Sequence, residues 1–249
     1  MVSIKNFTAR LGNQLFQLAN AVSYAKRNNL QVSIPTWAYA EIFNGDFSTK
    51  PDTDRQKLLW SEPGFSYTPI PEGATLLEGY YQSEKYFSDN SEDILEMFSF
   101  ESSVVNAMTQ LHKDILNDRR PKVSMHLRRG DYLKWPKHHP VMDVSYFLKA
   151  SEQFPPNSLF VVFSDDPEWC KVNFPEGNYI FIEGQKDYED LCLMSMCDHN
   201  CIANSTFSWW GAWLNKNPNK IVVAPEKWFG PAYAHFSTKD LYCPSWIVI

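Results

Sequence analysis

Residues 123–132 have the sequence VSMHLRRGDY. The apolar run 123–127 is typical of a buried strand, and two adjacent arginines follow it directly. Ligands of parallel α/β sheets bind outside the carboxyl ends of the strands, so the arginines and His126 are expected at such a place. A guanidinium is a rigid fork of donors that matches phosphate oxygens. This stretch therefore predicts an anion site, and the alternative for one of the arginines is a structural Arg129–Asp131 ion pair.

Short apolar runs alternate with amphipathic stretches along the rest of the chain. Leu15, Leu18 and Val22 have helical spacing, which indicates a helix that begins near Gly12. Alternation of this kind predicts an α/β fold with parallel strands. Strands are expected at residues 2–4, 30–34, 76–80, 123–127, 159–163, 179–182, 201–203 and 221–224, and residues 91–117 are expected to be helical.

The polar segment 117–121 is the expected domain boundary. It separates residues 1–118 from residues 119–249, and each part has the length and pattern of a small Rossmann-like domain. Two such domains facing each other across a cleft fit the pattern. Residues 36–74 are rich in proline and are predicted to be mostly loop.

The composition of the 249 residues excludes several classes of protein. A formal charge of −6 argues against a general nucleic-acid binder. No apolar run is long enough to span a bilayer, and no signal peptide is recognisable, so we expect a soluble cytoplasmic protein. The five cysteines are an odd number without zinc-ligand spacing, which indicates reduced, buried side chains.

A second candidate anion site follows the strand predicted at 201–203. Asn204, Ser205 and Thr206 precede a helical segment, and hydroxyl groups combined with free backbone N–H groups at a helix start can bind an anion. Plain capping of the helix is the alternative. The tryptophans at 209, 210 and 213 are expected in the core.

Two further turns carry polar side chains. Arg10 and Asn13 lie in the turn between the first strand and the first helix, where Gly12 permits a tight bend. Asp165 and Asp166 follow the strand predicted at 159–163. They could hold a divalent metal, but capping of the next helix is favoured because Pro167 suits its first position.

These segments together resemble the GDP-fucose-dependent fucosyltransferases, in particular the α-1,2-fucosyltransferase family of glycosyltransferases. The blocks occur in the order of the family and reach nearly from end to end. Ala9 departs from the pattern, because many members carry glycine there. The matching blocks are ARLGNQLFQLA at 9–19, GYYQSEKYF at 79–87, HLRRGDY at 126–132, FSDD at 163–166, ANSTFSWWGAWL at 203–214 and VVAPEKWF at 222–229.

The resemblance implies a GT-B-like fold, with 1–118 as the acceptor-side domain and 119–249 as the GDP-fucose-binding domain. It implies transfer of L-fucose from GDP-β-L-fucose with inversion, without a metal or other cofactor. The acceptor would be a glycan, with the 2-hydroxyl of a terminal β-galactoside as the family expectation. By this analogy Arg128 stabilises the leaving GDP, and Arg10 reaches the fucose and phosphates. The donor-binding residues would be His126, Arg128, Asp190, Asn204, Ser205, Thr206, Phe207 and Asn13.

The catalytic base is less clearly indicated. Asp131 and His139 are the candidates, since both lie near the HLRRGDY segment and can accept a proton. Three alternatives to this function stay open: transfer of fucose in a different linkage, a non-catalytic carbohydrate-binding protein, and a nucleotide-binding regulatory domain.

Overall fold

The computed structural model describes residues 1–48 and 57–249. The proline-rich segment predicted as loop includes residues 49–56, which lie outside the described residues. Contacts group the chain into two compact units. Unit 1 consists of residues 1–101 and 236–243, and unit 2 consists of residues 102–235 and 244–249.

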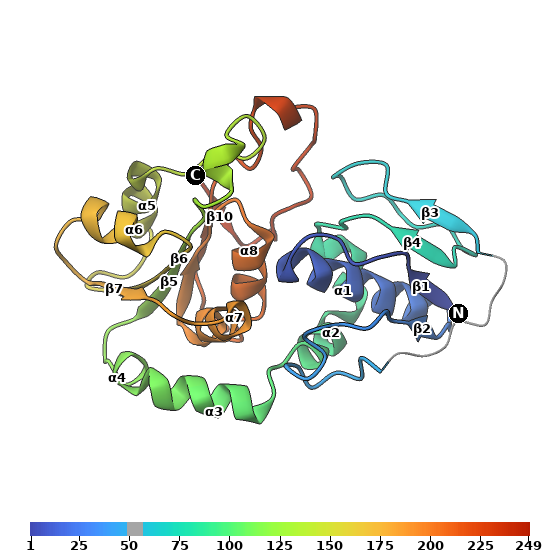
Figure 1. Ribbon diagram of the computed structural model, residues 1–249, viewed down its shortest axis with the longest axis horizontal. Helices are drawn as coiled ribbons and strands as arrows, with labels where there is room; N and C mark the ends of the chain where they lie inside the picture. Colours follow the sequence, from blue (N-terminus) through green and yellow to red (C-terminus); the bar gives the residue numbers. More distant parts are fainter. Residues whose placement is uncertain (49–56) are drawn as a thin grey trace. The chain divides into compact units, whose positions relative to one another are not determined.

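Unit 1 is built on a four-stranded parallel sheet with the order β2-β1-β4-β3. The first predicted helix is confirmed as α1, which packs against β1 (Figure 1). The sequence analysis did not assign β3, which lies in the region predicted as loop. The strands are β1 (Val2–Ile4), β2 (Val32–Ser33), β3 (Leu59–Ser61) and β4 (Leu76–Glu78), and the helices are α1 (Leu11–Arg27) and α2 (Ser91–Met97).

Unit 2 is built on a six-stranded sheet with the order β10-β9-β8-β5-β6-β7, and every pair is parallel. The prediction of an α/β fold with parallel strands is confirmed, although β10 was not foreseen. The strands are β5 (Lys122–Leu127), β6 (Leu159–Ser164), β7 (Tyr179–Ile182), β8 (His199–Cys201), β9 (Val222–Ala224) and β10 (Ile247–Val248). The helices are α3 (Ser102–Leu111), α4 (Lys113–Leu116), α5 (Val144–Ser151), α6 (Pro167–Asn173), α7 (Asp187–Met196) and α8 (Thr206–Trp213).

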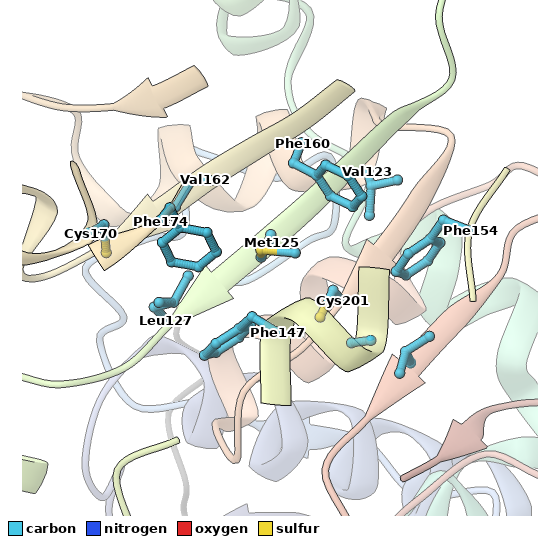
Figure 2. Packing of buried hydrophobic residues seen from close by; sticks show 12 residues of the cluster. Val123, Met125, Leu127, Phe147, Phe154, Phe160, Val162, Cys170, Phe174 and Cys201 are labelled. Atoms are coloured by element: carbon cyan, nitrogen blue, oxygen red, sulfur yellow. The ribbon is translucent and has the colours of Figure 1, made fainter. Parts of the chain in front are cut away.

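The two faces of the unit 2 sheet are buried in different clusters. Val123, Met125 and Leu127 of β5 pack on one face with Phe147 of α5 and Cys170 of α6 (Figure 2). On the other face, residues 159, 161 and 163 of β6 pack with α7. Since side chains alternate along a strand, His126 of β5 points to the face opposite Met125, the side of α7.

The stretch 91–117, predicted to be helical, forms three helices with an interruption at residues 98–101. Residues 98–101 leave the helical path because their backbone bonds to another segment of unit 1: the N–H of Asn44 donates to the carbonyl of Ser99, and the N–H of Glu101 donates to that of Ile42. Phe43 and Phe100 form an antiparallel bridge beside these bonds. Tertiary hydrogen bonds thus divide the stretch into α2, α3 and α4.

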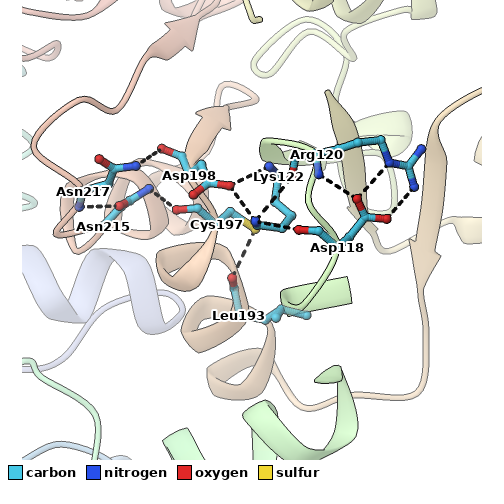
Figure 3. A network of polar contacts seen from close by, with 8 residues as sticks. All are labelled: Asp118, Arg120, Lys122, Leu193, Cys197, Asp198, Asn215 and Asn217. Atoms are coloured by element: carbon cyan, nitrogen blue, oxygen red, sulfur yellow. Dashed lines mark hydrogen bonds and ion pairs between the residues drawn. The ribbon is translucent and has the colours of Figure 1, made fainter. Parts of the chain in front are cut away.

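The segment 117–121, where a domain boundary was predicted, is held within unit 2 by hydrogen bonds. Arg120 donates from Nε and Nη2 to the carboxylate of Asp118, and the N–H of Lys122 donates to Asp198 at 2.7 Å (Figure 3). Helix α3 also packs against α7. Residues 102–118 therefore group with unit 2, whereas the sequence analysis placed them with the N-terminal half.

The cysteines and the apolarity of the helices bear on two expectations from the composition. All five cysteines are free and buried, as predicted. Within residues 1–48 and 57–249, no helix is both long and apolar enough to cross a membrane.

Candidate functional site

The polar motifs of unit 2 meet at the carboxyl ends of β5, β6 and β8. The loop after β5 contacts the loop after β6, where the N–H groups of Arg129 and Gly130 donate to Asp165 Oδ1 at 2.8 and 3.0 Å. It also contacts the segment after β8, where the Tyr132 hydroxyl donates to the carbonyl of Asn204 at 2.9 Å. Because neighbouring parallel strands end at the same edge, three segments far apart in the sequence form one candidate site.

Arg128 lies at the centre of this edge and is held by two carboxylates. Its Nη2 is 2.6 Å from Asp131 Oδ1, and its Nη1 is 2.7 Å from Asp165 Oδ2. The side chain is 15% exposed, so the guanidinium is oriented but still reached by solvent. A guanidinium has five N–H donors, and two ion pairs leave donors for a ligand oxygen.

Arg129 has a different environment. Its Nε donates to Asp166 Oδ2 at 3.0 Å, and its guanidinium lies 3.5 Å from the centroid of the Trp169 ring. Asp166 also caps α6 by accepting from the N–H of Trp169, with Pro167 at the first position, so the capping prediction is confirmed. The predicted structural ion pair of Arg129 therefore exists with Asp166 in place of Asp131.

His126 is buried on the α7 side of β5. Its ring centroid lies 5.4 Å from that of Phe207, the second residue of α8. Burial, reinforced by the positive charge of Arg128, lowers the pKa of His126 to about 3, so the imidazole is neutral at neutral pH. Its Nδ1 has no hydrogen-bond partner among the described residues, which leaves it available to a ligand.

The start of α8 is the second predicted anion site. Ser205 occupies the position before the helix, and its side chain makes no capping hydrogen bond. Asn204 is buried and donates from Nδ2 to the carbonyls of Pro140 and Trp228, while its Oδ1 has no partner among the described residues. The helix start thus keeps hydroxyl and backbone donors at the edge beside β5.

Trp209 and Trp210 of α8 belong to the core, as predicted, whereas Trp213 is only half-buried. Trp209 and Trp210 are fully buried, and the rings of Trp209 and Trp213 stack at 6.3 Å. A Cβ atom on Gly211 would lie 3.0 Å from Met194 of α7, so glycine permits the close packing of α8 on α7. This packing fixes the position of the α8 start.

Asp190 lies in the first turn of α7. Burial, together with the charges of Asp187 and Glu189, raises the pKa of Asp190 to about 7. Its Oδ1 has no hydrogen-bond partner among the described residues. A buried carboxylate in this state favours a ligand that brings its own N–H donors.

The two candidate bases lie on the same loop. Asp131 is engaged in the ion pair with Arg128. His139 stacks on the Tyr132 ring at 4.8 Å, and burial lowers the pKa of His139, so its neutral form can accept a proton. Their distances from a reacting hydroxyl depend on a bound acceptor, and both residues stay candidates.

Arg10 and Asn13 belong to unit 1. Arg10 is exposed and occupies the position before α1 without capping it through its side chain. Asn13 Oδ1 accepts from Gln82 Nε2 at 3.0 Å. Arg10 ends the loop after β1, and Asn13 is the third residue of α1, so both lie near the carboxyl edge of the unit 1 sheet.

The structure adds residues to this site that the sequence analysis did not select. Asp165 was interpreted as part of a helix cap, yet it fixes Arg128 and the following backbone. A Cβ on Gly130 would lie 2.6 Å from Asp165 Oδ2, so glycine is required for this contact. Among residues 1–48 and 57–249, no group of three or more His, Cys, Asp or Glu side chains could hold a metal ion.

Comparison with solved structures defines the class of fold. The chain is similar to the NodZ alpha-1,6-fucosyltransferase soaked with GDP-fucose, with a TM-score of 0.54, 14% identity, and coverage of 86% of this chain and 92% of that one. It is also similar to a mutant of Arabidopsis thaliana FUT1 in complex with GDP, with a TM-score of 0.59, 12% identity, and coverage of 90% of this chain and 70% of that one. The predicted GT-B-like α/β fold class is therefore confirmed.

The chain belongs to glycosyl transferase family 11, whose model matches residues 2–249. Among curated proteins it is 37% identical over 183 residues to the O-antigen biosynthesis glycosyltransferase WbnK of Escherichia coli, covering 69% of this chain and 59% of the relative. It is 36% identical to the Alpha-1,2-colitosyltransferase of Escherichia coli, covering 63% and 57%. It is 27% identical to Galactoside alpha-(1,2)-fucosyltransferase 2 of Oryctolagus cuniculus, covering 98% and 75%. The match thus spans less than two thirds of the length of the two bacterial relatives.

Proposed function

We propose that the protein is an inverting fucosyltransferase that moves L-fucose from GDP-β-L-fucose to a glycan hydroxyl. The proposed acceptor group is the 2-hydroxyl of a β-galactoside. The observation that carries the proposal is Arg128, oriented by Asp131 and Asp165 at the carboxyl edge of a family 11 chain. Membership of the family and relatives named as α-1,2-transferases support the proposed linkage.

In the proposed donor site, different segments of unit 2 contact different parts of GDP-fucose. Asp190 would accept hydrogen bonds from guanine N1–H and the guanine amino group, with neutral His126 in the same pocket. The unpartnered Asn204 Oδ1 and the hydroxyls of Ser205 and Thr206 would contact the nucleotide, and the phosphates would receive donors from the α8 start and Arg128. Arg10 and Asn13 are proposed to contact the donor from unit 1.

The proposed reaction is a direct displacement at C1 of fucose. The acceptor oxygen forms a bond to C1 while the bond from C1 to the β-phosphate oxygen breaks, and the hydroxyl proton passes to His139 or Asp131. Negative charge grows on the leaving GDP. The Arg128 guanidinium and the helix start are fixed before the reaction, so they stabilise this charge without reorganising.

The test is turnover of GDP-fucose with a panel of β-galactosides, with and without EDTA, followed by linkage analysis of the product. Guanine-specific stabilisation by GDP and GDP-fucose, compared with UDP and ADP, is measured in parallel. We expect an α-1,2 product and no effect of EDTA. Binding of saccharides without any guanine-specific shift would instead favour a carbohydrate-binding protein, and guanine-specific binding without turnover a regulatory domain.

One comparison favours a second donor. A relative with 36% identity is named Alpha-1,2-colitosyltransferase. Colitose is L-fucose without the 3-hydroxyl group, so the same nucleotide site would accept GDP-colitose. The ratio of kcat/KM for GDP-fucose and GDP-colitose decides between the donors, because a site that hydrogen-bonds the 3-hydroxyl discriminates strongly against a sugar without it.

A further inference from the structure

The segment Gly79–Gln82 follows β4 and has no role in the proposed reaction. Gln82 donates from Nε2 to Asn13 Oδ1 at 3.0 Å, so its carboxamide reaches the first turn of α1. Gln82 is 6% exposed, and its Oε1 has no hydrogen-bond partner among the described residues. A buried acceptor without a donor is costly, and it points to a donor that the chain itself does not supply.

Two nearby glutamines show that this is not general in unit 1. Gln17 accepts from the N–H of Thr8 and donates to the carbonyl of Gly79 at 2.8 Å. Gln14 donates to the carbonyl of Ala9 and accepts from the indole N–H of Trp37. Both carboxamides have protein partners at each end and are structural, whereas that of Gln82 is satisfied at one end only.

The backbone beside Gln82 is held in an unfavourable conformation. Tyr81 has φ +55°, which is rare for a bulky residue. Glu62 fixes it, because Oε2 accepts from the N–H groups of Tyr80 and Tyr81 at 2.8 and 2.9 Å while Oε1 accepts from the Tyr86 hydroxyl at 3.1 Å. Strain that the surroundings maintain in this way is concentrated at functional sites.

Aromatic rings lie next to the same turn, one of them exposed and two half-buried. Tyr80 is 40% exposed, and its ring stacks on Phe65 with centroids 5.8 Å apart and an angle of 14°. The ring of Phe65 in turn lies against that of Phe236, with centroids 4.5 Å apart. Three segments of unit 1 thus present an aromatic surface beside a polar group, the combination that small polar ligands require.

We propose that this edge of unit 1 is a saccharide subsite, in which Gln82 Oε1 accepts a hydrogen bond from a pyranose hydroxyl and Tyr80 packs against the sugar ring. The subsite rests on the proposed function for the identity of its ligand, which is either the acceptor glycan or the sugar of the donor. Glu62 acts as a positioning residue through the backbone of residues 80 and 81.

The experiment compares wild type with Gln82→Leu and Tyr80→Ala. Initial rates are measured with lactose and GDP-fucose varied separately, and GDP binding and thermal midpoints are measured for each variant. Binding of lactose and of free L-fucose is followed by saturation-transfer NMR, which needs no turnover. Tyr80→Phe is the matched control, since it keeps the ring.

We expect each variant to raise the KM of one saccharide substrate about tenfold, with a thermal midpoint within about 3 °C of wild type. A change confined to lactose identifies the acceptor, and a change confined to GDP-fucose with unchanged GDP binding identifies the donor sugar. Folded variants with wild-type KM for both substrates and wild-type saccharide NMR signals would overturn the subsite. If wild type itself neither binds GDP nor turns over, the proposed function fails, and the NMR comparison still decides whether residues 80 and 82 contact a sugar.

Discussion

Asp165 and Arg128 form an ion pair in which the carboxylate is itself held by backbone N–H groups. One oxygen of Asp165 lies 2.7 Å from Arg128 Nη1, and the other accepts from the N–H groups of Arg129 and Gly130. Because β5 and β6 are adjacent, the loop after one strand orients the cation carried by the other. Orientation before substrate binding is what electrostatic stabilisation of a leaving group requires.

Substitution of this pair should reduce turnover in two steps. Arg128→Ala removes the cation, and we expect kcat to fall about 100-fold or more. Asp165→Asn keeps an oxygen for the backbone donors but loses the ion pair, and we expect a smaller fall with GDP still bound. Steady-state kinetics on folded protein test both. Turnover by Arg128→Ala close to that of wild type would show that Arg128 is misassigned.

Arg129 should matter for stability and not for turnover. Its side chain is 11% exposed, contacts Asp166 and lies over the Trp169 ring. We expect Arg129→Ala to lower the free energy of unfolding by about 2 kcal/mol, because Asp166 loses its partner and the ring loses its cation. Denaturant unfolding measures this loss. Under conditions in which the variant is fully folded, its kcat should stay within about threefold of wild type. A large loss of kcat at unchanged stability would contradict the structural role.

The contrast between the two arginines explains which features the sequence could predict. Strand periodicity and the position after β5 identified the segment, because both are local properties. The roles of Arg128 and Arg129 depend on Asp165 and Asp166, which lie in the loop after a different strand. The same holds for residues 98–101, where hydrogen bonds to residues 42 and 44 override helical periodicity. Gln82 was likewise undetectable, since only its lack of a partner in the folded chain distinguishes it from Gln17.

Asp190 should give both stability and donor binding a pH dependence near neutrality. The pKa of Asp190 is raised to about 7 in the folded chain, above the ordinary value of about 3.9 expected after unfolding. Between these values the folded state holds a proton that the unfolded state releases. The free energy of unfolding therefore falls as pH rises from about 4 to about 7, and the loss is complete above that range.

Asp190→Asn tests this assignment. The variant should be more stable than wild type at pH 8, and the difference should shrink towards pH 5 in thermal unfolding. Since guanine N–H groups would prefer the ionised carboxylate, the affinity of wild type for GDP-fucose should rise between pH 6 and 8, and the variant should bind weakly at every pH. The binding experiment uses GDP-fucose instead of GDP, because the phosphates of GDP-fucose do not titrate in this pH range. Identical pH profiles for the two proteins would refute the role of Asp190.

Ala9 adopts φ +58°, a conformation for which glycine has no steric penalty. Ala9→Gly should therefore raise the free energy of unfolding by about 0.5 kcal/mol, the relief of strain being partly offset by the freedom that glycine adds to the unfolded chain. The matched control is Ala107→Gly, the same chemical change at an exposed position inside α3, which should cost about 1 kcal/mol. Thermal and denaturant unfolding of the two variants side by side measure both values. Stabilisation by Ala9→Gly together with destabilisation by Ala107→Gly would support strain at Ala9. Destabilisation by both substitutions would mean that the turn after β1 is relaxed with alanine in place.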